Sequence, residues 1–327
     1  MATLRRNLFI FGWCVIGSLL IDLPSATVLN NASSGTDFFI PLIGAWDLHC
    51  GALHHSALGA GFYLPYEFIG WLFGYGDWTV RYTQAMIFIL ISCLAWFTLN
   101  NRLGGWLAAS ATAYLSLYAA SPVNVGDSPF VIYQSIYYDL LPIALGQLAI
   151  LCAFFPAPRR GIGLVVICCL LGLESMIKTN LAMTDTVLVA AAFVVLRRDF
   201  FAVLPVMAVG GLTAIMQFNP DLARASHVRL HNLLAEPVGY LDGSLTYGVA
   251  GGFSKIANYT QDTFWIWSIP TVAIVVTLSK IGRPAMSFAV VLAGLVGADL
   301  LRSVTNSVDM TWPFTILVTL AYLRNSK

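Results

Sequence analysis

Ten long apolar runs dominate this sequence of 327 residues and restrict the folds that it can adopt. Each run is close to the roughly 20 residues that a helix needs to cross the hydrocarbon core of a bilayer, which is about 30 Å thick. Only 10% of the residues are charged, whereas an ordinary soluble domain carries roughly 25%. The sequence therefore predicts an all-α, polytopic transmembrane helical bundle with about ten spans, forming a single membrane domain over residues 1–327. The runs are 7–28, 83–100, 104–122, 138–156, 161–178, 181–197, 200–217, 263–279, 284–302 and 311–324.

The positions of Arg and Lys orient these spans. Short cytoplasmic loops carry an excess of basic residues. If the further apolar stretch 57–75 lies at the membrane surface, the basic residues of the later turns fall on the same side as Arg5 and Arg6. If 57–75 spans, all of them move to the other side. We therefore expect both termini to be cytoplasmic and 57–75 to be an interfacial or re-entrant helix. The basic residues concerned are Arg102, Arg159, Arg160, Arg197, Arg198, Lys280, Arg283, Arg324 and Lys327.

In this topology two long segments lie outside the cell membrane. The first external loop covers 36–81 and the second long loop covers 218–262; all five histidines are external. The internal turns are too short for a nucleotide-binding domain, and there is no GxxxxGK[ST] motif. The net charge of +1 and the lack of a basic patch with interleaved aromatic residues give no indication of nucleic-acid binding. A site on the external face is the natural expectation.

The first external loop holds the first set of candidate site residues. Asp37 has the chemistry of a general base, but a Thr-Asp pair before an apolar run is also a typical helix N-cap. His49, His54 and His55, together with Asp37 and Asp47, have side chains of the types that ligate metals; the alternative is that these histidines hydrogen-bond to lipid headgroups or loop backbone. Asp127, in the next external loop, either is an ordinary turn acid or pairs with Asp37.

A second set of candidates carries charge in or beside the predicted spans. A charged side chain at the centre of a membrane helix costs at least ~2.5 kcal/mol, so it is a functional candidate by default. Glu174 and Lys178, with Asp185 nearby, either form a helical ion pair or place Lys178 against a lipid phosphate. Arg81 is either a phosphate ligand or an anchor that extends toward the membrane surface.

The order of these elements resembles the N-terminal half of the GT-C integral-membrane glycosyltransferases, over about residues 1–200. The most similar branch is that of the protein O-mannosyltransferases and lipid A aminoarabinose transferases. Asp37 takes the place of the acidic residue in the first external loop. His55, in the string HSAL, stands where that family has a His-Pro-Pro-Leu element. Arg81 follows a Phe-Gly pair, as the lone arginine of the family does.

Two later residues extend the resemblance. Asp127 is the best candidate for the second external acid, and Lys178 resembles a lysine that such proteins carry near the middle spans. The resemblance implies an enzyme that transfers a sugar from a polyprenyl-phosphate lipid to an acceptor on the external, periplasmic face. It implies Asp37 as general base, with Asp127 and His55 holding the site through a divalent metal ion. Lys178, Arg81 and the histidines, His54 included, would then bind the lipid-linked sugar donor.

The same features leave other functions open. A member of this superfamily can serve as a non-catalytic subunit of a larger complex, in which case its partners are other membrane proteins. A lipid or ion transporter is a third possibility, which would need charges deep in the spans. In each case we expect an integral protein of a bacterial inner (plasma) membrane.

Overall fold

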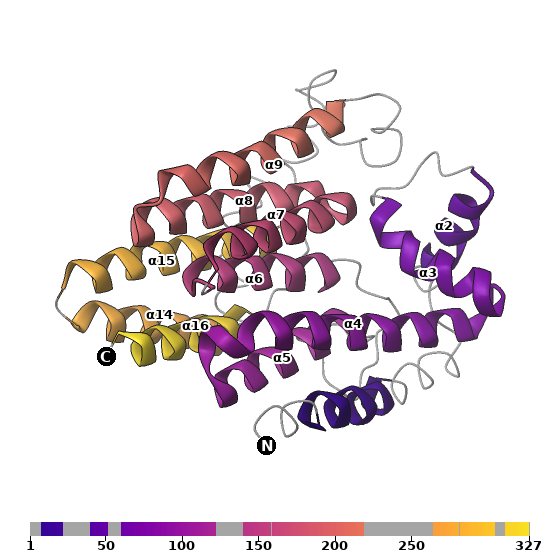
Figure 1. Ribbon diagram of the computed structural model, residues 1–327, viewed down its shortest axis with the longest axis horizontal. Coiled ribbons are helices and arrows are strands. Elements are labelled where there is room, and N and C mark those ends of the chain that lie inside the picture. The colour runs from indigo at the N-terminus through magenta and orange to yellow at the C-terminus, as the bar shows by residue number, and fades with distance from the viewer. Residues whose placement is uncertain are drawn as a thin grey trace.

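The computed structural model describes residues 8–21, 40–51, 60–121, 140–157, 159–218, 264–280, 282–304 and 311–326. Within these ranges the regular structure is entirely helical, which confirms the predicted all-α class (Figure 1). An N-terminal helix covers Leu8–Ile21. The others are α2 (Ile40–His49), α3 (Ala60–Phe73), α4 (Asp77–Leu103), α5 (Gly105–Ala120), α6 (Leu140–Phe154), α7 (Arg160–Ile177), α8 (Thr179–Ala192), the π-helix η2 (Phe193–Arg197), α9 (Phe200–Phe218), α14 (Phe264–Ser279), α15 (Arg283–Val304) and α16 (Thr311–Asn325).

Each predicted apolar run has a helix at its position. Two of these helices, Trp78–Leu103 and Arg160–Ile177, are long and apolar enough to cross a membrane by length and composition. Further apolar helices of the described residues have 10–17 residues. A bundle with membrane-crossing helices is therefore supported, while the number of ten spans stays a prediction. Helix α2 agrees with the alternative in which the Thr-Asp pair at 36–37 precedes a helix, and not with the interpretation of this stretch as a polar loop.

Large apolar side chains cover much of the outer surface of the bundle. On α9, Phe200, Phe201 and Leu204 are 65%, 84% and 70% exposed. Comparable side chains are exposed on α4, among them Leu90 and Phe97. Contiguous apolar surface of this kind is rare on soluble monomers and is typical of surfaces that face lipid or another protein.

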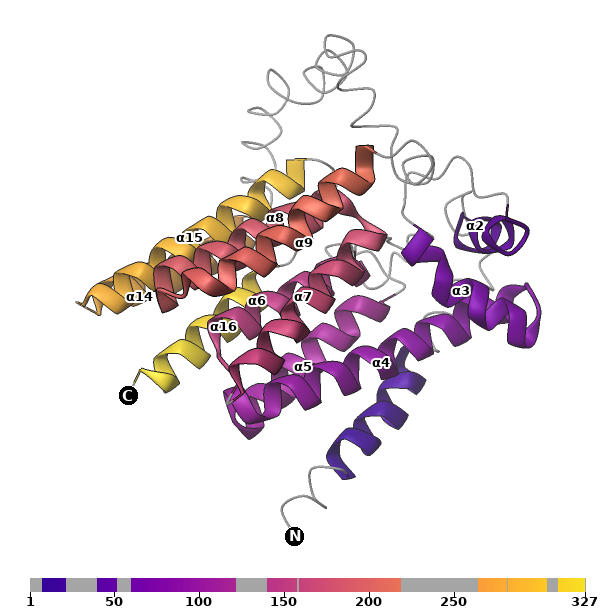
Figure 2. The ribbon, with the colours of Figure 1, turned by 45° about the horizontal axis from the view of Figure 1, so that its top comes forward.

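Helix α6 forms the centre of the bundle. Its side chains are buried from Leu140 to Phe154 except at Leu141, which is partly buried. It contacts α4, α5, α7, α8 and η2, and Figures 1 and 2 show it enclosed by these helices. An apolar helix that is surrounded on all sides is typical of the interior of a large helical protein.

One end of the bundle is held together by arginine side chains, and we call it the arginine end. Arg102 of α4 donates hydrogen bonds to the carbonyl oxygens of Cys152 (3.0 Å) and Phe155 (2.9 Å), which terminate α6. Arg197 also donates to Cys152 O, at 3.5 Å. Arg324 of α16 donates to the carbonyl of Leu103, at the end of α4. These contacts satisfy helix carbonyls that have no partner within their own helix.

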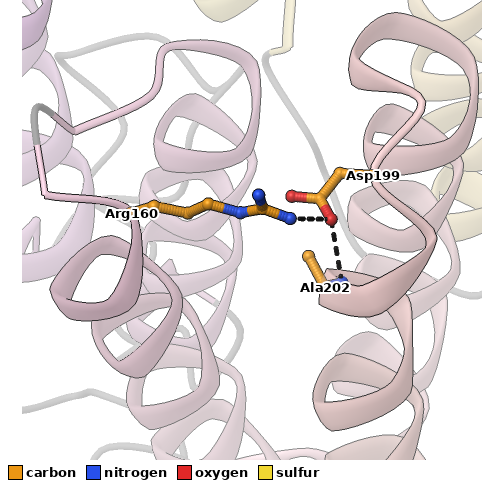
Figure 3. Close-up of polar contacts among 3 residues, drawn as sticks. All are labelled: Arg160, Asp199 and Ala202. Atoms are coloured by element: carbon orange, nitrogen blue, oxygen red, sulfur yellow. Dashed lines mark hydrogen bonds and ion pairs between the residues drawn. The ribbon is translucent and has the colours of Figure 1, made fainter.

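The arginine end also contains an ion pair between α7 and α9. Arg160 and Asp199 bind each other, and Asp199 accepts a hydrogen bond of 3.2 Å from the backbone N–H of Ala202 (Figure 3). Asp199 thereby caps the first turn of α9. Arg102, Arg160, Arg197 and Arg324, which the charge pattern assigned to one side, thus lie at one end of the structure. Arg5, Arg6 and Lys327 lie outside the described residues, and which compartment this end faces stays a prediction.

Helices α2 and α3 lie at the opposite end of the bundle, which we call the hairpin end (Figure 2). They pack closely because Gly44 leaves room for the ring of Tyr63. Helix α3 has 14 residues and is therefore about 21 Å long, but helices inside the bundle are of similar length, with 15 residues in α6 and 14 in α8. The prediction that it is an interfacial helix in the first external loop stays a prediction.

A tight turn joins α3 to α4 at the hairpin end. Gly74 adopts a positive φ of 86°, a conformation that glycine takes without steric cost. The Thr79 hydroxyl donates to Gly74 O (2.8 Å) and accepts from the Gly76 N–H (3.1 Å). This arrangement starts α4 at Asp77, before the predicted apolar run begins at residue 83.

Candidate functional site

The candidate site lies where α7 turns into α8 at the hairpin end. A single extended residue, Lys178 (φ −148°, ψ 100°), separates the two helices. The Lys178 N–H donates to Glu174 O at 2.8 Å, and the Ala182 N–H donates to Lys178 O at 3.2 Å. Because the chain reverses within one residue, side chains of the last turn of α7 and of the first two turns of α8 share the same depth in the bundle.

Two fully buried carboxylates, Glu174 and Asp185, meet at this depth. Both point at Gly146 of α6. Glu174 Oε1 lies 2.9 Å from the position that a Cβ atom of residue 146 would occupy, and Asp185 Oδ2 lies closer still. The missing side chain of Gly146 therefore makes the space into which two acidic groups from neighbouring helices project.

The electrostatics of this carboxylate pair differ from those of an ordinary surface ion pair. If both carboxylates were ionised, they would repel each other and each would lose its hydration. A proton held by the pair or a nearby cation would relieve this cost. Lys178, which is partly exposed, is the basic residue of this junction. The pair is thus a polar centre inside an otherwise apolar bundle, with the chemistry required to hold or move a proton.

Helix α3 reaches the same junction. Its Gly61 packs directly on Met176 in the last turn of α7, so that a Cβ atom at residue 61 would lie 2.8 Å from the Met176 Cβ. The views of Figures 1 and 2 agree that the first turn of α3 lies beside the end of α7. The segment 52–59, which carries His54 and His55, connects directly to this turn.

The predicted site residues are placed in part. Lys178 and Arg81 both lie at the hairpin end. The Arg81 guanidinium stacks on the ring of Trp78, 4.6 Å from its centroid, and this aromatic contact fits the predicted anchoring role. Asp37, Asp127, His54 and His55 lie outside the described residues, so their predicted convergence with Lys178 stays a prediction.

The predicted metal site also stays a prediction. Its expected ligands, Asp37, Asp127 and His55, lie outside the described ranges. Within those ranges no group of three or more His, Cys, Asp or Glu side chains is placed to hold a metal ion. The described part of the site therefore offers a carboxylate pair and a lysine, and its further ligands depend on the external loops.

A polar and aromatic cluster between α2 and α3 was missed at the sequence level. His49 Nδ1 lies 3.1 Å from Glu67 Oε1. The rings of Trp46 and Tyr75 pack on His49, with centroid separations of 5.9 Å and 5.6 Å. Burial raises the pKa of the Tyr75 hydroxyl, and the charges of Glu67 and Cys50 raise it further. The 18-residue separation of His49 and Glu67 gives no local signal of this contact.

Replacing Glu67 by Gln tests the strength of this contact. Both side chains are partly exposed, 41% for His49 and 26% for Glu67, so the ion pair should contribute only about 0.2–1 kcal/mol. We expect a small decrease in the thermal unfolding midpoint of the detergent-solubilised protein, with Asp47→Asn, on the helix that carries His49, as the control. A loss of several kcal/mol would contradict this interpretation of the cluster.

No family model matches this sequence, and neither a curated protein nor a solved structure shows significant similarity to it.

Proposed function

We propose that this protein is an integral-membrane transferase of the GT-C type, which moves a sugar from a polyprenyl-phosphate lipid to an acceptor at the hairpin end of the bundle. The observation that carries the proposal is the contact between Gly61 and Met176. It brings residue 61, to which the segment with His54 and His55 connects in the chain, beside the end of α7, which precedes Lys178. A lipid-linked substrate would reach this junction along the apolar outer surface of the helices.

In this mechanism each charged residue has a separate task. Asp37 removes the proton from the acceptor hydroxyl or amine as the acceptor attacks the sugar. Lys178 and Arg81 bind the polyprenyl phosphate and stabilise the negative charge that develops as the bond between sugar and phosphate breaks. Asp127 and His55, with His54 beside them, hold the substrate and would supply ligands for a divalent metal ion, which would neutralise phosphate charge.

An assay of sugar transfer in proteoliposomes tests this proposal. With a polyprenyl-phosphate sugar as donor, Asp37→Asn should lower the transfer rate by about 10²–10⁴-fold, the usual contribution of a general base. Lys178→Gln should raise the KM for the donor lipid, and Lys178→Arg should restore part of the loss. Asp47→Asn, which changes an acid of the neighbouring helix α2, is the matched control. Full activity of the Asp37→Asn protein would exclude Asp37 as the base.

The buried carboxylates favour one second candidate, a proton-coupled transporter. Acidic residues inside a membrane bundle are typical of proton relays, and Glu174 and Asp185 occupy such a position. This function predicts that a pH gradient across the proteoliposome membrane drives solute uptake that Asp185→Asn abolishes. Sugar transfer without any dependence on a pH gradient would instead support the transferase.

A further inference from the structure

The arginine end carries far more positive than negative charge where η2, α7 and α9 meet. Five arginines belong to this region: Arg102, Arg159, Arg160, Arg197 and Arg198. Asp199 is the acidic residue that the structure places among them, and it is bound to Arg160 and to the first turn of α9 (Figure 3). One carboxylate cannot balance five guanidinium groups, so this surface attracts anions.

Two of these arginines converge although their charges repel. Arg102 and Arg197 both donate to the carbonyl oxygen of Cys152. Among the residues that the structure describes, Arg197 Nε is buried and has no hydrogen-bond acceptor. A buried donor without an acceptor costs about 1–3 kcal/mol. The cluster therefore has both uncompensated charge and an unused donor.

Apolar surface begins directly beside these guanidinium groups. Ile162 and Val165 of α7 are 56% and 61% exposed, and they follow Arg160 within two helical turns. Phe201 and Leu204 of α9 are exposed in the first turns after Asp199. Helices α7 and α9 pack against each other. Cationic groups above an exposed apolar strip match a molecule with an anionic head and hydrocarbon chains.

We propose that this surface binds an anionic phospholipid, with its phosphate on the arginines between η2 and α7 and its acyl chains along α7 and α9. Guanidinium groups form paired, charge-assisted hydrogen bonds with phosphate oxygens, and basic clusters at the end of a membrane bundle attract anionic headgroups. The site lies at the end opposite the candidate transferase site. It depends on the bundle being embedded in a bilayer and not on the proposed reaction.

Native mass spectrometry of the full-length protein in detergent tests the proposal. Phosphatidylglycerol and phosphatidylcholine with identical acyl chains are titrated separately, and the dissociation constant of the first bound lipid is measured. We expect phosphatidylglycerol to bind at least about tenfold more tightly. The double variant Arg159→Gln/Arg198→Gln should weaken that binding by about fivefold for each cation removed, without affecting phosphatidylcholine. Both side chains are exposed, so the variant should fold.

A second double variant separates a specific site from general charge attraction. Lys280→Gln/Arg283→Gln removes the same charge from exposed positions where α14 turns into α15, at the same end of the bundle (Figures 1 and 2). Its phosphatidylglycerol affinity should stay within about twofold of the unaltered protein. Equal affinity of the unaltered protein for both lipids would overturn the proposal. Equal losses in the two double variants, or no loss in Arg159→Gln/Arg198→Gln, would overturn it as well.

Discussion

Replacing Gly146 by Ala should strongly destabilise the protein. The added Cβ atom would collide with Asp185 Oδ2 and would lie 2.9 Å from Glu174 Oε1. Both carboxylates are fully buried, so they cannot move aside into solvent. Inserting atoms into a well-packed interior typically costs 1–3 kcal/mol, and displacing two charged groups adds to that cost. We expect a clearly lower thermal unfolding midpoint and less folded protein in detergent.

Two further variants make this prediction specific. Gly172→Ala, in the middle of α7, is the matched control because an added Cβ atom there meets nothing within 4 Å. That variant should be neutral or more stable by up to about 1 kcal/mol, since Ala is the better helix former. Adding Asp185→Ser to Gly146→Ala removes the closest colliding atom and should recover much of the lost stability. An unchanged melting temperature for Gly146→Ala alone would refute the convergence of α6, α7 and α8 at this glycine.

Replacing the buried carboxylates by amides should separate stability from activity. Glu174→Gln and Asp185→Asn keep the shape of each side chain and remove one of two neighbouring buried acids, which would repel each other if both were ionised. We expect each variant to unfold at the same or a higher temperature than the unaltered protein. If the pair serves the reaction through a proton or cation that it holds, sugar transfer should fall by at least about 100-fold.

The combination of results decides between a structural and a functional role. When a residue serves stability, replacing it makes the protein less stable. Active sites, in contrast, often contain groups that destabilise the fold. A large fall in unfolding temperature with normal transfer would mean that the pair is structural. The double variant Glu174→Gln/Asp185→Asn completes a cycle, which measures the interaction between two groups that both approach Gly146.

The fold class was predictable from the sequence because its signals are local. Each apolar run can be recognised from its own contiguous residues, without knowledge of the rest of the chain. Each run coincides with a described helix. The common position of Arg102, Arg197 and Arg324 at one end was predictable too, since basic residues follow alternate runs. The boundaries shifted where a local hydrogen bond decided them, as at Thr79 in front of α4.

The site was only partly predictable because its central contact joins three helices. Glu174 and Asp185 were marked as costly charges, but their meeting depends on the glycine at position 146, which lies on a third helix. Nothing in the spacing of these residues encodes that packing. The contact between His49 and Glu67 escaped prediction for the same reason, since it required α2 to be a helix that folds back on α3.

The enclosure of α6 has a consequence for how the chain is assembled. Helices α7 and α8, which cover two of its sides, follow it in the sequence and leave the ribosome later. When α6 first enters the bilayer, the two sides that α7 and α8 cover later are open, and its polar Gln147 has the earlier helix α5 to turn to, where Tyr114 accepts its hydrogen bond of 3.5 Å in the finished structure. Membrane helices insert first and associate afterwards. Truncation after α6 should therefore leave a helix that the membrane-protein quality control degrades.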